Sequence, residues 1–179
     1  QALWTIVQAK QRGANDLYFG TTLAGRPPEV EGLDQLAGLF TNTIPIRLNL
    51  DPLKSVKQWC QHVQKQAIER QAHVYASVNE IADWANISSS RLETDHLLLV
   101  QKFPRTTAPN TGLKFKDFSG DITSTFPITV VVVQDTELSL YLRYDDKIIS
   151  EELANWYLHN LGGLLTNIKT LENDTIDQV

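Results

Sequence analysis

The segment "FPITVVVV", residues 126–133, constrains the fold more than any other part of the sequence. It is apolar almost throughout, whereas a strand with one solvated face alternates apolar and polar residues. This run therefore predicts a central strand that is covered on both faces. The segment "ELSLYLRY", residues 137–144, alternates cleanly and is predicted to be its antiparallel neighbour across a turn at Gln134 and Asp135.

The remaining periodic segments predict a layered domain. Further strands are expected at residues 17–23, 44–50, 96–103 and 113–118, and helices at 2–10, about 53–72, 77–85 and from 151 onward. The helix stripe at 53–72 is predicted to contain Leu53, Val56, Cys60, Val63 and Ala67. The order α-β-β-α-α-β-β-β-β-α indicates the α/β class, with a mixed, largely antiparallel sheet covered by helices.

The charge balance excludes several classes of partner. A net charge of −5 and a pI near 5.3 argue against nucleic acid, and the scattered basic residues form no site for an anionic membrane. No apolar run reaches the roughly 18 residues that span a bilayer. The single cysteine, Cys60, excludes an internal disulfide, suits a reducing compartment and predicts a cytoplasmic location.

The start of the sequence predicts a piece of a longer chain. There is no methionine anywhere, and the first helical segment, "ALWTIVQAK", follows no capping Ser, Thr, Asp or Asn. The chain is therefore expected to begin inside a helix.

A search for catalytic groups finds no complete constellation. His62, His73, His96 and His159 have no zinc-ligand spacing with one another or with a cysteine, so no metal site is predicted. Cys60 lies in an apolar helical stripe, which indicates a buried inert thiol. The pair Asp145-Asp146 follows a strand and is interpreted as a solvated turn.

Residues 19–48, "FGTTLAGRPPEVEGLDQLAGLFTNTIPIRL", carry a specific resemblance. They are similar to the signature region of condensation domains from nonribosomal peptide synthetases, which reads approximately F-G-T-T-V-S-G-R-P, then an acidic loop, then G-L-F-I-N-T-L-P-V-R. The matching positions are Gly20, Thr21, Thr22, Gly25, Arg26, Pro27, Gly32, Gly38, Leu39, Phe40, Asn42, Thr43, Pro45 and Arg47. Weaker similarity in "DHLLLVQKFP" and "FPITVVVV" extends the resemblance over essentially the whole chain.

One departure determines what the resemblance implies. The family's catalytic signature, H-H-x-x-x-D-G, is absent, because no two histidines are adjacent here. That signature belongs to the N-terminal lobe of a two-lobed fold similar to chloramphenicol acetyltransferase. The resemblance therefore implies that residues 1–179 are the C-terminal lobe, a half-domain with no catalytic residue of its own and no activity alone.

The implied activity of the parent is peptide-bond formation between aminoacyl or peptidyl thioesters. These are held on the 4'-phosphopantetheine of carrier proteins, so the lobe itself is expected to bind no cofactor directly. The implied partners are the N-terminal lobe of the same domain and the donor and acceptor carrier proteins, with no nucleic acid and no membrane. Three alternatives stay open: an ester-forming acyltransferase that uses carrier proteins, a degenerate condensation domain, and a non-catalytic module that docks a carrier.

The resemblance also implies roles for individual residues. A loop at about residues 24–42 would form the floor of the substrate tunnel, and its expected residues are Gly25, Arg26, Pro27, Gly38, Phe40, Asn42 and Thr43. A latch that reaches the other lobe would lie at about residues 118–126, with Ser119 and Thr125. Arg26 is expected either to pair with the motif aspartate of the absent lobe or to face solvent. Asn42 and Thr43 are expected to hold the loop through side-chain-to-backbone hydrogen bonds.

Overall fold

The computed structural model describes residues 1–25, 31–32, 35–92, 94–102 and 124–179. The elements are a set of helices, strands and short 3-10 turns, in this order: α1 (Ala2–Arg12), β1 (Asp16–Ala24), β2 (Thr41–Asn49), α2 (Val56–Arg70), η2 (Gln71–His73), α3 (Val78–Ala85), η3 (Ser89–Leu92), β3 (His96–Lys102), β4 (Ile128–Gln134), β5 (Leu138–Tyr144), α4 (Glu151–Leu171) and η4 (Ile176–Gln178). The predicted strand at residues 113–118 lies outside the described residues.

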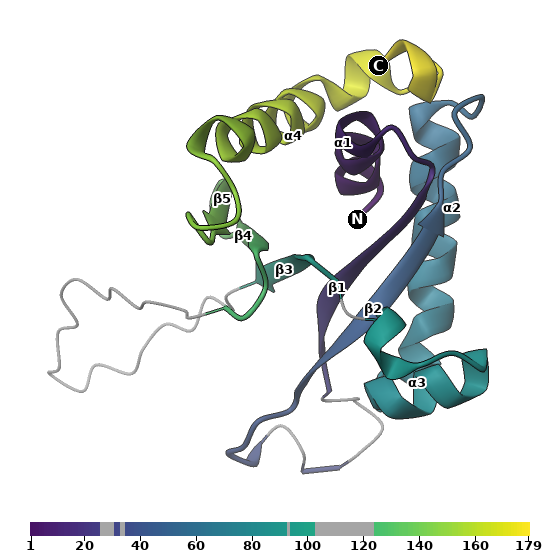
Figure 1. Cartoon of the computed structure of the whole chain (residues 1–179), viewed down its shortest axis with the longest axis vertical. Helices are drawn as coiled ribbons and strands as arrows, with labels where there is room; N and C mark the ends of the chain where they lie inside the picture. Colours follow the sequence, from purple (N-terminus) through teal and green to yellow (C-terminus); the bar gives the residue numbers. More distant parts are fainter. Residues whose placement is uncertain (26–30, 33–34, 93, 103–123) are drawn as a thin grey trace, which may run out of the picture.

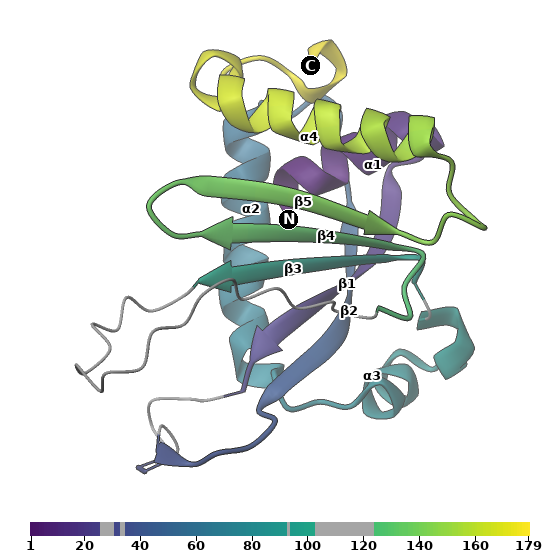
Figure 2. The ribbon, with the colours of Figure 1, turned by 90° about the vertical axis from the view of Figure 1, so that its left-hand side faces the viewer.

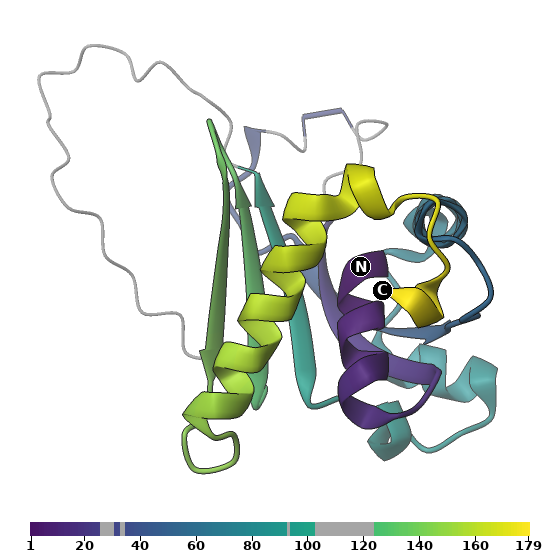
Figure 3. The same ribbon diagram turned by 90° about the horizontal axis from the view of Figure 1, so that it is seen from above.

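The strands form one mixed sheet in the order β2-β1-β3-β4-β5 (Figure 2). The β1–β2 and β4–β5 pairs are antiparallel, while β1–β3 and β3–β4 are parallel. Helices α1, α2 and α4 lie on one side of this sheet, and α3 lies beyond its β1–β2 end (Figures 1 and 3). The predicted α/β class is confirmed, and β4 is an internal strand between β3 and β5. The predicted cover on both faces of β4 is not seen in the described residues, whose helices α1, α2 and α4 all lie on one face of the sheet.

The core lies between the sheet and its three covering helices. Because side chains alternate along a strand, every second residue of each strand points at the helices. The core contains mainly large apolar side chains from the sheet and the helices, including Phe19, Ile46, Leu98, Ile128, Val130, Trp4, Ile6, Trp59, Tyr157 and Leu161. Burying this much apolar surface is the main stabilising term for the fold.

Helix α2 begins later than the sequence periodicity predicts. Ser55 is its N-cap and forms a capping box with Gln58, so the helix starts at Val56 rather than at Leu53. Leu53 lies in the preceding turn and is 76% exposed. The buried residues of the helix are Val56, Trp59 and Val63, whereas Cys60 is half-buried. The Leu53 assignment was wrong because the Ser55 cap starts the helix after that residue.

Strand β2 also has a boundary that differs from the prediction. It begins at Thr41, and Asn42 and Thr43 pair with Leu23 and Thr22 of β1. The expected loop therefore ends at Phe40, because the residues after it continue the antiparallel ladder. Pro45 is opposite Gly20 in this edge strand. Because proline has no N–H, it fits a position whose backbone groups point away from the partner strand.

The last residues of the chain fold back onto the start of α2. The N–H groups of Val56 and Lys57 donate to the carbonyl oxygens of Asp174 and Glu172. These are first-turn N–H groups, which have no partner within the helix itself. Ile176 is 4% exposed, so this C-terminal tail, residues 172–179, is anchored by both backbone hydrogen bonds and a buried side chain.

Candidate functional site

The two ends of the β1–β2 loop meet at Gly25 and Phe40. The Gly25 N–H donates to the Phe40 carbonyl oxygen at 2.6 Å. A Cβ on residue 25 would overlap that same oxygen, so the contact requires glycine. A Cβ on Gly38 would lie 3.0 Å from the Phe40 ring. Three of the predicted floor residues therefore form one contact cluster, while Arg26 and Pro27 lie outside the described residues.

Asn42 ties this cluster to the connection between α2 and α3. Its side-chain Nδ2 donates to the carbonyl oxygens of Val74, at 2.8 Å, and Ala76, at 2.9 Å. The side-chain-to-backbone bonds expected for Asn42 are therefore present. Thr43 differs from the expectation, because its hydroxyl lies 3.1 Å from the Thr22 hydroxyl of the neighbouring strand instead of bonding to backbone.

Consecutive residues of β2 line two different cavities. Asn42 lines a cavity of about 320 Å³ together with Gly25, Phe40 and Tyr75. Thr43 lines a second cavity of about 550 Å³, whose wall includes Gly20, Pro45, Asp95, Thr125 and Phe126. The predicted floor residue Thr43 and the predicted latch residue Thr125 therefore line the same cavity, whereas Gly25, Phe40 and Asn42 line the other one. Ser119 lies outside the described residues.

Phe126 forms part of the wall of the larger cavity by packing against β1. A Cβ on Gly20 would lie 3.4 Å from the Phe126 ring and 3.3 Å from Leu97. Nearby, the Ser124 and Thr129 hydroxyls are 2.7 Å apart, and Ser124 accepts a hydrogen bond from the Phe126 N–H. These contacts fix the described end of the predicted latch against the starts of β3 and β4.

Arg47, another residue of the signature, lies away from the floor residues. Its guanidinium donates two hydrogen bonds of 2.8 Å to the Asp16 carboxylate at the other end of the β1–β2 pair. This contact lowers the pKa of Asp16, and the guanidinium also stacks over the Tyr18 ring at 5.3 Å. Because both charges are largely exposed, the pair sets the local geometry of the hairpin more than it stabilises the fold.

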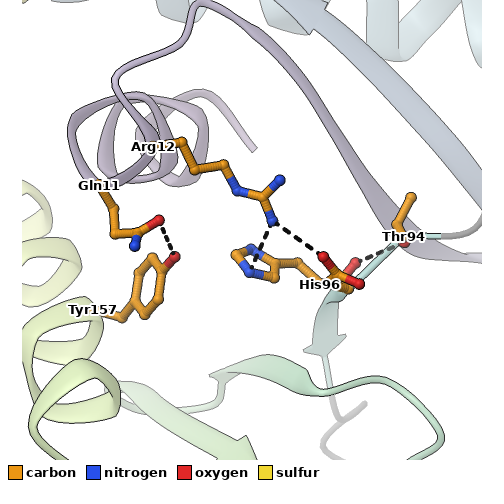
Figure 4. A network of polar contacts seen from close by, with 6 residues as sticks. Gln11, Arg12, Thr94, His96 and Tyr157 are labelled. Carbon is orange, nitrogen blue, oxygen red and sulfur yellow. Dashed lines mark hydrogen bonds and ion pairs between the residues drawn. The ribbon is translucent and has the colours of Figure 1, made fainter. Parts of the chain in front are cut away.

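A partly buried polar network, which the sequence did not reveal, joins α1, β3 and α4 (Figure 4). Arg12 Nη2 lies 3.3 Å from His96 Nε2 and 3.7 Å from the Asp95 carboxylate. The Tyr157 hydroxyl donates to the Gln11 side chain at 3.0 Å. Desolvation, with a smaller effect of the Arg12 charge, lowers the pKa of His96 to about 3. No local pattern could predict this network, because Arg12 and His96 are 84 positions apart.

The described residues contain no group of three or more His, Cys, Asp or Glu side chains that could hold a metal ion. Burial raises the pKa of the half-buried Cys60 thiol, which makes it a poor nucleophile. Asp145 accepts a hydrogen bond from the Lys147 N–H, as expected for a turn. No helix in the described ranges is long and apolar enough to cross a membrane.

Comparison with known proteins identifies the family. The family model described as Condensation domain matches residues 1–179. The chain is 30% identical over 161 residues to tyrocidine synthase 3 of Brevibacillus parabrevis, covering 87% of this chain and 2% of that protein. It is 24% identical over 186 residues to bacitracin synthase 3 of Bacillus licheniformis, covering 100% of this chain and 3% of that protein. The chain belongs to the condensation-domain family.

Solved structures show the same fold. The first condensation domain of the CDA synthetase matches with a TM-score of 0.75 at 16% identity, covering 99% of this chain and 40% of that one. A protein designated CT matches with a TM-score of 0.84 at 16% identity, covering 99% of this chain and 43% of that one. The chain therefore spans less than half of these two structures, and only 2% and 3% of the lengths of the two synthetases.

Proposed function

We propose that this chain is the C-terminal lobe of a condensation domain that forms peptide bonds in nonribosomal peptide synthesis. The family match over residues 1–179 supports this assignment. The coverage of 40% and 43% of the two solved chains is the share expected of one lobe in a two-lobed domain. The N-terminal lobe of the same domain and two carrier proteins are then its partners, in the cytoplasm.

The proposed reaction joins two substrates that arrive on separate arms. The amine of one carrier-bound aminoacyl group attacks the thioester carbon of the other, and the thiol of the donor's phosphopantetheine leaves. Holding both groups in one tunnel supplies much of the rate, because the attack becomes effectively intramolecular. A histidine that positions or deprotonates the amine would come from the other lobe. The isolated chain has no adjacent pair of histidines and is proposed to be inactive.

The observation that carries the proposal is the closed base of the β1–β2 loop. Gly25 and Phe40 join its two ends, and Asn42 holds the following strand to the carbonyl oxygens of Val74 and Ala76. A loop that forms the floor of a tunnel must keep its position while long substrates pass over it. The three contacts supply that rigidity without placing a reactive group in the path.

Arg26 is proposed to pair with the motif aspartate of the N-terminal lobe. A buried carboxylate without a partner is costly, and Arg26 follows directly on the Gly25 contact in the sequence. In the intact domain, Arg26→Ala should lower both stability and peptide-bond formation. An Arg26→Ala domain that keeps both properties would support the alternative of a solvent-facing arginine.

The test of the proposed function uses the intact condensation domain that contains this chain. Donor and acceptor carrier proteins are loaded with aminoacyl groups, and dipeptidyl product is measured by mass spectrometry. The domain should form product, and Asn42→Ala should reduce the rate about tenfold or more, because its two hydrogen bonds hold the loop. Asn155→Ala changes an exposed residue of α4 and is the matched control.

The same assay separates the proposal from its alternatives. An acceptor that carries a hydroxyl in place of the amine should give no product, whereas product from that acceptor alone would indicate an ester-forming enzyme. An intact domain that binds loaded carriers but forms no product would indicate a degenerate or docking module. Product from the isolated 179-residue chain would contradict the assignment as a catalytically incomplete lobe.

A further inference from the structure

Four polar side-chain atoms are buried without a protein partner between α1 and β3. They are the indole Nε1 of Trp4, both amide atoms of Gln8, and the Nδ1 of His96. Trp4, Gln8 and His96 are 1%, 0% and 3% exposed, so bulk solvent does not reach them. Nearly all such buried groups in folded proteins are hydrogen-bonded, which makes this concentration informative.

The three side chains lie in the same part of the core. Trp4 and Gln8 are one helical turn apart, and residues at this spacing lie on the same face of a helix. The Trp4 ring is 5.4 Å from the His96 ring at the start of β3, and both rings pack against Tyr157 of α4. Trp4 and His96 therefore meet where α1, β3 and α4 pack together, and Gln8 is buried one turn along α1 on the Trp4 face.

The hydrogen-bonding roles of these atoms follow from Arg12. A guanidinium can only donate, so its contact with His96 Nε2, at 3.3 Å, makes Nε2 an acceptor. A neutral imidazole with an accepting Nε2 carries its hydrogen on Nδ1. His96 Nδ1, Trp4 Nε1 and the Gln8 amide nitrogen are then all donors, and the Gln8 Oε1 is the one acceptor among the four unpartnered atoms.

One water molecule can satisfy three of these four atoms, namely Trp4 Nε1, His96 Nδ1 and Gln8 Oε1. A water oxygen accepts two hydrogen bonds and its hydrogens donate to others, and buried waters typically make about three such bonds to groups that lack protein partners. We propose that an internal water molecule binds between Trp4, Gln8 and His96. It accepts from the indole and imidazole N–H groups and donates to the Gln8 carbonyl oxygen, and so links α1 to β3.

A crystal structure of the chain, at a resolution that shows ordered water, tests the proposal directly. Density for one water within hydrogen-bond distance of Gln8 Oε1 and at least one of the two ring N–H groups is the expected result. In solution, the slowly exchanging His96 Nδ1–H should show NMR cross-relaxation with water. A dry site, or a direct bond from His96 Nδ1 to Gln8 Oε1 that excludes water, would overturn the proposal.

The variant Gln8→Leu separates a satisfied Gln8 amide from an unsatisfied one, while the crystal structure and the NMR measurement separate a bound water from a direct His96–Gln8 bond. If water is bound, the substitution removes its acceptor, and the melting temperature should fall by about 2–6 °C. If the site is dry, leucine replaces an unsatisfied amide with an apolar group of similar size, and the melting temperature should rise. The matched control Gln61→Leu, at an exposed position of α2, should change it little. A raised melting temperature for Gln8→Leu contradicts the proposal.

Discussion

At the scale of single residues, the base of the β1–β2 loop depends on a backbone contact that excludes any side chain. The carbonyl oxygen of Phe40 occupies the space where a Cβ of residue 25 would lie. The neighbouring glycine, Gly38, faces only the Phe40 ring, which can move. Both positions are glycines of the same loop. An added methyl group would meet a backbone oxygen at Gly25 but a movable side-chain ring at Gly38.

Replacing Gly25 with alanine should therefore destabilise the protein, by about 1–3 kcal/mol, because the bond to Phe40 is lost and the strands must separate locally. The free energy of unfolding, from urea titration, measures this effect. Gly38→Ala is the matched control and should cost less than about 1 kcal/mol. Equal losses at the two positions would show that the Phe40 carbonyl is not the cause.

His96 should make stability fall in acid. Its pKa is about 3 in the folded protein and near 6.5 when unfolded, so between these values the unfolded chain binds the additional proton. The contribution of the neutral His96 ring to the free energy of unfolding is fully present above about pH 6.5, and it is lost as the pH falls toward 3. Arg12, Asp95 and Tyr157 are the charged or titratable groups that face the ring.

At pH 4.5 the loss due to His96 should be about 2–3 kcal/mol relative to pH 7. Urea titrations across this range measure the slope, and His96→Phe should flatten it. His159→Phe removes an exposed imidazole of α4 and should leave the slope unchanged. A His96→Phe protein with the original slope would assign the acid sensitivity to other groups.

At the scale of elements, the strands and most helices could be predicted from periodicity, whereas their ends depend on particular contacts. The apolar alternation of Ile44, Ile46 and Leu48 indicated β2 correctly, and all three are buried. Its start at Thr41 was not predicted, because pairing with β1 extends the strand through polar residues. The start of α2 was predicted too early. The apolar repeat begins at Leu53, but the helix starts only after the Ser55 cap.

Helix α4 contains two adjacent glycines in its interior, which periodicity alone does not explain. A Cβ at Gly162 or Gly163 would meet no other atom within 4 Å. Glycine in a helix interior costs about 0.5–1 kcal/mol relative to alanine. Gly163→Ala should therefore raise the free energy of unfolding by about that amount, as measured by urea titration.

Gly13 provides the matched control for this prediction. A Cβ there also meets nothing within 4 Å, but the residue has a φ of 63° and is the C-cap of α1. Gly13→Ala should lower stability by about 1 kcal/mol, because alanine disfavours the left-handed conformation. If Gly163→Ala raises the free energy of unfolding and Gly13→Ala lowers it, the backbone conformation is the cause of the difference. A loss of stability in Gly163→Ala would contradict the prediction.

At the scale of the whole molecule, the class of fold could be predicted from the sequence, but the contacts that bring the candidate site residues together could not. Asn42 was recognised through its neighbours in sequence, whereas its acceptors, Val74 and Ala76, lie 32 and 34 positions away. The Arg12–His96 network is more distant still. Contacts between residues so far apart in sequence depend on how the sheet packs against its helices. No short sequence motif predicts that packing.

The C-terminal tail joins residues 172–179 to the start of α2 and can be tested as a unit. Ile176→Ala should lower the free energy of unfolding by about 2–4 kcal/mol, because it leaves a cavity beneath the tail. Amide hydrogen exchange at Val56 and Lys57 should accelerate, since the tail carbonyls accept from these N–H groups. Glu172→Ala removes an exposed ion pair with Lys57 and should cost less than about 0.5 kcal/mol. Unchanged exchange in Ile176→Ala would show that the tail is held by other contacts.

The parallel pairing of β1 with β3 has a consequence for biosynthesis. Thr21 and Leu98, which this pairing joins, are 77 positions apart, so at about 5–20 residues per second the ribosome needs about 4–15 s to supply the partner strand. Once β2 has been made, the β1–β2 hairpin exists without its neighbour for the rest of that interval, and Phe19 and Ile46 lack the sheet that later extends beside them. Because non-local pairing is slow, the nascent chain should be a client of ribosome-associated chaperones.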